Sequence, residues 1–204
     1  SFLNKKGKNI CEEYHLTDSK VIIYVGTMDK PRYLAVLIQA FSKVRETREN
    51  VKLLMVGEGS DKENLKRLAE NLGLEGHVIF TGQVLQSKVP NFIAAADIGV
   101  SPVPPLSFYK LSSPIKMFEY MAMAKPVVAN EEVFQHKEAI EQGGGGILVP
   151  FTSEAFAEAI IKLLDSAEKA AEIGQKGREW VVKNHSFEKL AKGLERAYYK
   201  VLKG

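Results

Sequence analysis

The run Val21-Ile22-Ile23-Tyr24-Val25 is hydrophobic at every position and is followed by Gly26. A strand without polar alternation is typical of a parallel sheet whose two faces are both covered by helices. Apolar residues then follow at helical spacing between 34 and 44, and a second buried run, 51–56, ends in Gly57-Glu58-Gly59. This succession of strand, helix and strand predicts a right-handed βαβ unit.

The same alternation continues along the chain. Further strands are expected at 78–80, 98–100, 126–129 and 147–149, with helices between them and three more at 154–165, 168–183 and 187–202. We therefore predict an α/β fold, a Rossmann-like, doubly wound, six-stranded parallel sheet with helices on both faces. The expected organisation is a linker or helix at 1–20, the main domain at 21–185 and a C-terminal helix at 186–204.

Local signals give the expected helix ends. Ser60 and Glu63 form a capping-box pattern before the second helix. Ser113 followed by Pro114 predicts a helix start with a hydroxyl cap and proline at the first helical position. Gly143–Gly146 leads into a strand rather than a helix, and is interpreted as a flexible turn.

Composition excludes several classes of protein. The 204 residues are 45% hydrophobic and 26% charged, with a net charge of +3, so no basic field for nucleic acid is predicted. A single cysteine, Cys11, rules out a disulfide framework, and the four scattered histidines have no metal-binding spacing. The absence of a long apolar run or a signal peptide favours the cytoplasm. Because the chain starts at Ser1 rather than Met, we expect a piece of a longer protein.

In a doubly wound sheet, ligands bind beyond the carboxyl ends of the strands. Four loops are therefore candidates: those after Val25, Val56 and Phe80, and the segment 101–114. In the loop after Val25, Gly26 permits close approach of a ligand, and Lys30 or Arg32 could pair with phosphate. The alternative is an ordinary turn between strand and helix that binds no ligand. Gly57-Glu58-Gly59 lacks the third glycine of a dinucleotide fingerprint, so NAD is disfavoured and a tight turn is the alternative.

The segment 111–128 is the most informative. The start of its helix could receive a diphosphate on backbone amides, helped by the helix dipole. Lys116 and Glu119 share one helix face, where a lysine suits phosphate and a carboxylate suits a ribose diol. The alternative is a solvated ion pair with no ligand. The opposite, buried side of this helix is expected to hold Met117, Tyr120 and Met121.

These pieces together resemble the retaining glycosyltransferases of the GT-B fold in family 4, also called group 1. The resemblance covers about residues 20–200 and follows the family's order: Tyr24-Val25-Gly26, Leu37-Ile38-x-Ala40-Phe41, Val56-Gly57-Glu58-Gly59, Phe80-Thr81-Gly82, Ala94-Ala95-Ala96-Asp97, Ser113-Pro114-x-Lys116-x-Phe118-Glu119-Tyr120-Met121-Ala122, Lys125-Pro126-Val127-Val128-Ala129 and Gly146-Ile147-Leu148-Val149-Pro150.

The resemblance implies that this chain is the half that binds a nucleotide-sugar donor. By that resemblance Glu119 holds the ribose, the backbone of Val84 contacts the base, and the helix start at Ser112 and Ser113 meets the diphosphate. The remaining donor-site residues are expected to be Gly26, Thr27, Arg32 and Lys116 at the diphosphate, with Gly57 and Glu58 elsewhere in the cleft.

Three positions depart from the family pattern. Thr27 stands where the family usually has an arginine, and Arg32 occupies the place of a lysine that follows. Leu111 replaces the first of two glutamates that are separated by seven intervening residues, so the identity of the sugar cannot be inferred. Phosphate binding is then expected to depend more on Arg32 and Lys116.

The function expected is transfer of a hexose from a UDP-sugar or GDP-sugar to an acceptor hydroxyl, without a metal or cofactor, in polysaccharide or glycolipid biosynthesis. The acceptor would be bound by an N-terminal half outside this chain, and any membrane association would be peripheral, at the inner face. Open alternatives are an epimerase or phosphorylase of the same fold and a non-catalytic binding module, the last favoured by Thr27 and Leu111.

Overall fold

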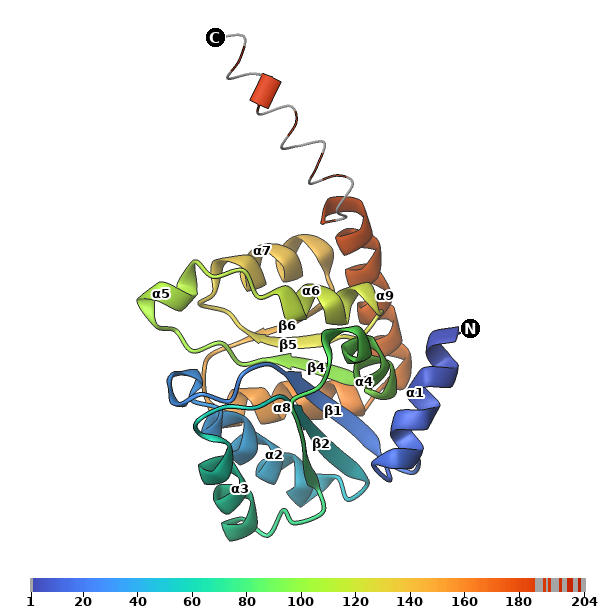
Figure 1. The fold of residues 1–204 in the computed structure, drawn as a ribbon, viewed down its shortest axis with the longest axis vertical. Helices are drawn as coiled ribbons and strands as arrows, with labels where there is room; N and C mark the ends of the chain where they lie inside the picture. The colour runs from blue at the N-terminus through green and yellow to red at the C-terminus, as the bar shows by residue number, and fades with distance from the viewer. Residues whose placement is uncertain are drawn as a thin grey trace.

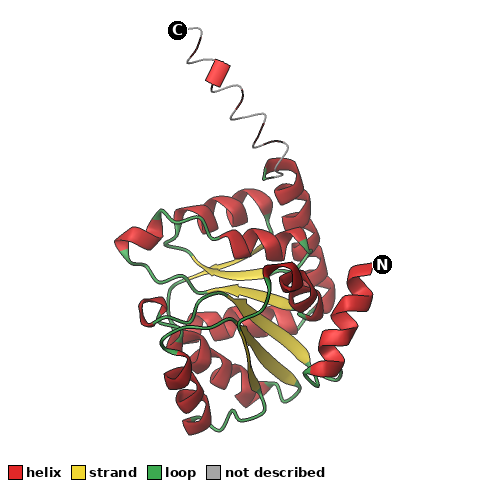
Figure 2. Cartoon of the chain, in the orientation of Figure 1, coloured by secondary structure: helices red, strands yellow, loops and turns green. Residues whose placement is uncertain are grey.

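The computed structural model describes residues 2–185 and, beyond them, residues 189, 191, 195, 198, 199 and 202. Six strands form one sheet in which every pairing is parallel. The spatial order is β3-β2-β1-β4-β5-β6, which confirms the predicted doubly wound fold (Figures 1 and 2). The strands are β1 (Lys20–Val25), β2 (Val51–Val56), β3 (Val78–Gly82), β4 (Ile98–Ser101), β5 (Val127–Asn130) and β6 (Gly146–Val149).

Helices cover both faces of the sheet. One face packs against α2 (Ala35–Thr47), α3 (Lys62–Asn71) and α8 (Ser153–Leu164), and the other against α1 (Phe2–Glu13), α4 (Val89–Ala95), α6 (Ile115–Ala122) and α7 (Phe134–Gly143). The long helix α9 (Ala167–Asn184) contacts α6, α7 and α8. Three short helical segments lie in the loops: η1 (Lys30–Arg32), η2 (Gln86–Lys88) and α5 (Ser107–Lys110).

Strand β1 shows why its sequence is apolar throughout. Ile22 and Tyr24 belong to the core under α2 and α8, whereas Val21, Ile23 and Val25 belong to the core under α4 and α6. Successive side chains of a strand point to opposite faces, so a central strand covered on both sides needs an apolar residue at each position.

The N-terminal segment is a helix that packs on the domain. Helix α1 lies along α4 (Figure 1), and a Cβ added at Gly7 would be 3.0 Å from the Cβ of Ala94. Cys11 is half-buried on this helix, and burial raises the pKa of its thiol. Of the helix expected at 187–202, the structure describes residues 189, 191, 195, 198, 199 and 202, which are helical, and the rest lies outside the described residues.

Two expected helix caps are wrong. Helix α3 begins at Lys62 after Asp61, and Ser60 instead binds Asp29, whose Oδ1 accepts from the amide at 2.9 Å and from the hydroxyl at 3.1 Å. Helix α6 begins at Ile115 with Pro114 as its non-helical N-cap residue. Ser113 contributes its backbone carbonyl to that turn, accepting from the Ile115 amide at 2.9 Å.

The glycine run 143–146 is closely packed rather than a flexible turn. It ends α7 and begins β6. A Cβ at Gly143 would lie 2.8 Å from the ring of Trp180, and one at Gly145 would lie 2.6 Å from the Cα of Gly177. The small residues therefore let α9 approach the sheet.

Helix α9 also holds α6 in place through aromatic rings. Phe118 of α6 stacks on Trp180 with ring centroids 6.5 Å apart, and on His185 at 4.4 Å. On the buried side of α6, Met117, Tyr120 and Met121 are fully enclosed, as predicted.

Candidate donor-binding site

The four candidate loops meet at the carboxyl edge of the sheet, where they enclose two adjoining cavities. The first, which we call the Arg32 cavity, has a volume of about 230 Å³. The second, which we call the Val84 cavity, has a volume of about 580 Å³. Their linings share four residues: Val25, Gly26, Thr27 and Lys116.

The predicted residues divide between these cavities. The Arg32 cavity is lined by Arg32, Ser112 and Ser113, and the Val84 cavity by Gly57, Glu58 and Val84, in addition to the shared residues. Glu119 is not among the described residues that line either cavity, and it is connected to the site through Lys116.

The loops after β1 and β2 interlock through glycine. The Gly26 amide donates to the carbonyl of Val56 at 3.0 Å. Gly57 has a φ of +140°, and a Cβ there would be 2.0 Å from the carbonyl oxygen of Gly26. A Cβ at Gly59 would likewise be 2.2 Å from the backbone carbonyl carbon of Met28. Because no side chain fits at 57 or 59, the G-x-G pattern is explained by packing between two loops.

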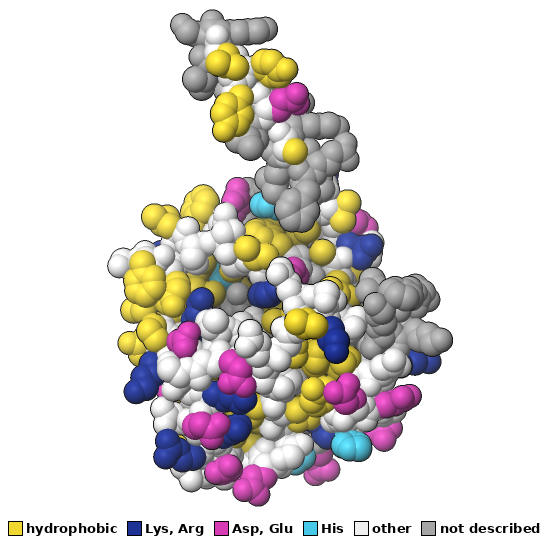
Figure 3. All heavy atoms as spheres, viewed as in Figure 1, with side chains coloured by type: hydrophobic (Ala, Val, Ile, Leu, Met, Phe, Trp, Pro, Cys, Tyr) yellow, Lys and Arg dark blue, Asp and Glu magenta, His cyan; other side chains and the backbone are white. Residues whose placement is uncertain are grey.

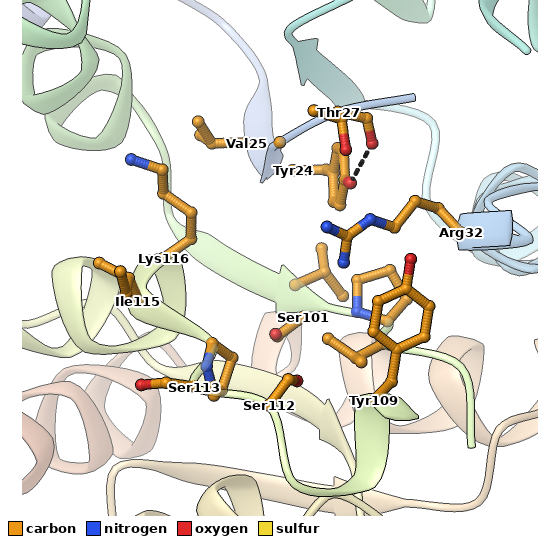
Figure 4. A pocket seen from close by; sticks show the side chains of 15 residues that line it. Tyr24, Val25, Thr27, Arg32, Ser101, Tyr109, Ser112, Ser113, Ile115 and Lys116 are labelled. Carbon is orange, nitrogen blue, oxygen red and sulfur yellow. Dashed lines mark hydrogen bonds between the residues drawn. The ribbon is translucent and has the colours of Figure 1, made fainter. Parts of the chain in front are cut away.

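Tyr24, on β1, fixes the loop that follows this strand. Its hydroxyl donates to the carbonyl of Thr27 at 2.7 Å (Figure 4). Only 7% of Tyr24 is exposed, and burial raises the pKa of its phenol, so the hydroxyl remains a neutral donor. The backbone at Thr27 is thereby fixed at the wall that both cavities share.

Arg32 points into its cavity from η1 and lies over an aromatic ring (Figure 4). Its guanidinium carbon is 4.7 Å from the ring centroid of Tyr109, a cation–π geometry. Tyr109 belongs to α5, which is held by an ion pair of 2.9 Å between Lys110 and Glu132. The planar guanidinium is thus oriented while its N–H groups remain available for a phosphate.

Lys116 approaches from the opposite side, on the first turn of α6 (Figure 4). Its ammonium is 2.9 Å from both carboxylate oxygens of Glu119. Both side chains are about one-third exposed. An ammonium has three donors and a carboxylate about four acceptor positions, so this pair can bind a ligand without separating.

The charge lining the two cavities favours an anion. Arg32 and Lys116 are the cations of the lining, and Glu58, the carboxylate of the lining, is paired with Lys62. Away from the cavities the charges are mixed, as Figure 3 shows for the acidic and basic side chains over α3.

Three polar side chains that line the Arg32 cavity are not among the residues predicted from the sequence. The sequence places Tyr24 in a strand and Ser101 and Tyr109 in the 101–114 loop, and the structure brings all three to the cavity wall. An arginine and a tyrosine 77 residues apart carry no local signal of their contact. The one available indication was that Tyr109 lies in a loop beyond a strand's carboxyl end.

Two kinds of feature are absent from the described residues. No group of three or more His, Cys, Asp or Glu among those residues is arranged to hold a metal ion. Within the same part of the chain, no helix is both long enough and apolar enough to cross a membrane.

Known proteins are similar to this chain in sequence. The family model described as "Glycosyl transferases group 1" matches residues 8–180. N-acetyl-alpha-D-glucosaminyl L-malate synthase from Bacillus anthracis is 29% identical over 194 residues, covering 94% of this chain and 49% of that protein. A GDP-mannose-dependent alpha-(1-6)-phosphatidylinositol monomannoside mannosyltransferase from Mycobacterium tuberculosis is 27% identical over 188 residues. The match covers 90% of this chain and 48% of that protein.

A solved structure shows the same fold. The crystal structure of Anabaena HepE in complex with UDP and glucose superposes with a TM-score of 0.81 at 20% identity, over 96% of this chain and 52% of that one. This chain thus spans about half the length of the relatives it matches. With a family model matching residues 8–180, the chain belongs to the group 1 family of glycosyl transferases.

Proposed function

We propose that this chain is the donor-binding half of a retaining glycosyltransferase that moves a hexose from a UDP-sugar or GDP-sugar to an acceptor hydroxyl. The observation that carries the proposal is the pair of adjoining cavities, which share a wall of Gly26, Thr27 and Lys116 and have cations on two sides. A nucleoside diphosphate sugar fits this arrangement, because its anionic diphosphate lies between an uncharged nucleoside and an uncharged sugar.

In this proposal the diphosphate lies against the shared wall. Arg32 and Lys116 approach it from opposite sides, and Ser112 and Ser113 border it along the wall that Tyr109 also lines (Figure 4). Arginine is suited to phosphate because its planar N–H groups can bind two oxygens at once, and lysine acts as a point charge.

The nucleoside then occupies the Val84 cavity. The backbone of Val84 contacts the base, and Gly57 and Glu58 border the space between base and diphosphate. Glu119 accepts hydrogen bonds from the ribose hydroxyls while Lys116, 2.9 Å from both carboxylate oxygens, orients its carboxylate. Both UDP and GDP occur with the similar proteins, in the HepE complex and in the name of the mannosyltransferase.

The reaction proposed breaks the bond between the anomeric carbon and the diphosphate oxygen. The acceptor oxygen bonds to that carbon, and its hydroxyl proton passes to the leaving diphosphate. Negative charge grows on the leaving diphosphate, where Arg32 and Lys116 stabilise it. The acceptor is held by an N-terminal half outside this chain. We further propose that the enzyme acts in polysaccharide or glycolipid biosynthesis in the cytoplasm, with any contact to the inner face of the membrane being peripheral.

A binding module without transferase activity is the second candidate. Leu111 favours it, because this side chain is 83% exposed at a position where the family has a glutamate. Product analysis with the longer protein separates these candidates from each other and from the enzymes of related chemistry. A glycosylated acceptor indicates a transferase, an isomerised sugar nucleotide or a sugar phosphate indicates an epimerase or phosphorylase, and the absence of any product indicates a binding module.

Thermal unfolding with UDP, GDP, ADP, CDP and NAD tests the donor site, followed by calorimetry on any ligand that stabilises. A ligand at 100 times its dissociation constant adds about 2.7 kcal/mol to the free energy of unfolding. At about 2–4 °C per kcal/mol, UDP or GDP should raise the melting temperature by several degrees. If none of the nucleotides raises it, and calorimetry carried out directly with UDP and GDP also detects no binding, the proposed donor site is refuted.

A further inference from the structure

Strand β4 ends in a serine that is paired with a buried histidine. The Oγ of Ser101 is 2.9 Å from the Nε2 of His136, and the Nδ1 of His136 is 2.9 Å from the backbone carbonyl oxygen of Asn130. His136 is fully buried and Ser101 is 7% exposed. Ser101 lines the Arg32 cavity, between Lys116 on one side and Tyr109 on the other (Figure 4).

The hydrogens of this chain of bonds have one consistent arrangement. A carbonyl oxygen only accepts, so Nδ1 of His136 carries a hydrogen and donates it to Asn130. Burial lowers the pKa of His136 to about 4, so its imidazole is neutral at pH 7 and Nε2 is a bare acceptor. Ser101 must then donate its hydroxyl hydrogen to Nε2, which leaves the oxygen with lone pairs alone.

Asn130 keeps this arrangement rigid. Its side-chain amide donates to the carbonyl of Val103 at 2.8 Å, and its Oδ1 accepts from the amide of Glu132 at 3.1 Å. The ends of β4 and β5 and the loop after β4 are thus joined around His136. Burial of a polar pair is unfavourable unless both side chains form hydrogen bonds. An apolar residue at position 101 would need no hydrogen-bond partner.

We propose that Ser101 is a specificity-determining residue of the donor site, and that its hydroxyl oxygen, oriented by His136, accepts a hydrogen bond from a hydroxyl of the donor hexose. This inference depends on the proposed function. If the diphosphate lies at the wall shared by the cavities and the nucleoside in the Val84 cavity, the sugar extends into the Arg32 cavity, where Ser101 is located. His136 is a positioning residue. Its Nε2 accepts the hydrogen bond from the Ser101 hydroxyl, so the Ser101 oxygen can bind only a ligand group that donates a hydrogen bond.

Calorimetry on the wild-type chain with UDP, UDP-glucose, GDP and GDP-mannose first identifies the nucleotide that binds. Ser101→Ala is then compared with wild type for the free nucleoside diphosphate and for its sugar nucleotide. The variant should bind the nucleoside diphosphate as wild type does, and bind the sugar nucleotide about three- to tenfold more weakly, as expected for one hydrogen bond. Ser42→Ala, in α2 and outside both cavity linings, is the matched control.

Fluorinated donors make the test sharper, because fluorine can accept but cannot donate. Each ring hydroxyl of the sugar is replaced by fluorine in turn. One of these analogues should bind the wild-type protein about three- to tenfold more weakly than the unmodified sugar nucleotide does. The same analogue should bind Ser101→Ala as tightly as the unmodified sugar nucleotide binds that variant. His136→Leu should lose the same sugar preference while retaining nucleoside diphosphate binding and a cooperative thermal transition.

The inference is overturned if Ser101→Ala changes the affinities for nucleoside diphosphate and sugar nucleotide equally, or changes neither. It is also overturned if no fluorinated donor distinguishes wild type from the variant. A wild-type chain that binds no nucleotide at all would instead refute the proposed function itself, which separates the two failures.

Discussion

The amide of Val25 donates a hydrogen bond of 2.8 Å to the hydroxyl of Tyr120, 95 residues further along the chain. Tyr120 is completely buried in α6, one residue after Glu119, and Val25 is the last residue of β1, directly before Gly26. This bond therefore joins the loop that forms the shared wall of the cavities to the helix that carries Lys116 and Glu119.

Tyr120→Phe should destabilise the protein, because it leaves the buried Val25 amide without a partner. The expected decrease in the free energy of unfolding is about 1–3 kcal/mol, measured by urea denaturation. Tyr33→Phe is a control, since Tyr33 is 55% exposed and should change stability little. An equal effect in both variants would show that the Val25–Tyr120 bond contributes nothing specific.

Glu119→Ala should weaken binding of the nucleoside diphosphate by about 10- to 100-fold, the range for hydrogen bonds to a charged group. Calorimetry with UDP and GDP measures this. The control is Glu172→Ala, which breaks a comparable lysine pair, at 2.7 Å to Lys176, on α9 outside both cavity linings. Unchanged nucleotide affinity in Glu119→Ala would exclude the ribose role.

Arg32→Ala should weaken binding of UDP or GDP by at least about tenfold, since a charged phosphate contact is lost. The corresponding nucleoside, uridine or guanosine, should bind wild type and variant alike, because it has no phosphate for Arg32 to contact. Arg67→Ala on α3 is the matched control, as Arg67 donates to Asn64 at 2.7 Å and lines neither cavity. A parallel loss of nucleoside affinity would mean that Arg32 supports the structure of the site instead.

The free energy of unfolding should fall as the pH decreases from 7 to 5, and His136 is the main group expected to cause this. Burial lowers the pKa of His136 from 6.5 to about 4 in the folded protein. The unfolded chain therefore binds more protons in the interval between these values, and acid favours unfolding. A lowering of this size corresponds to a loss of about 2 kcal/mol between pH 7 and pH 5.

Urea denaturation at several pH values measures that slope. His136→Leu should reduce the slope even if the variant is less stable at pH 7, because the titrating group itself is removed. A slope that is unchanged in His136→Leu would assign the pH dependence to other groups, such as His77, whose pKa burial also lowers.

The fold was predictable because its signals are local. The runs 21–25 and 51–56 have no charged residue except Lys52, and each is followed directly by glycine, so their status as buried strands follows from a few adjacent residues. The topology of parallel sheets then identified the four loops that enclose the cavities. The Lys116–Glu119 pair was also predictable, since helical spacing alone brings the two side chains together.

The errors arose where a partner lies far away in the sequence. Ser60 was expected to cap α3, but Asp29, 31 residues earlier, competes for its amide and hydroxyl. The contacts of Arg32 with Tyr109 and of Ser101 with His136 likewise depend on the assembled tertiary structure. Neighbouring residues carry no information about such contacts, so these parts of the site required the structure.

The stacking of Phe118 on Trp180 has a practical consequence for spectroscopy. Trp180 is the only tryptophan of the chain, and its ring contacts the helix that carries Lys116 and Glu119. Its fluorescence emission consequently comes from one defined place, behind the proposed donor site. A ligand-induced displacement of α6 can thus be followed in the native protein by its intrinsic emission, without an attached dye.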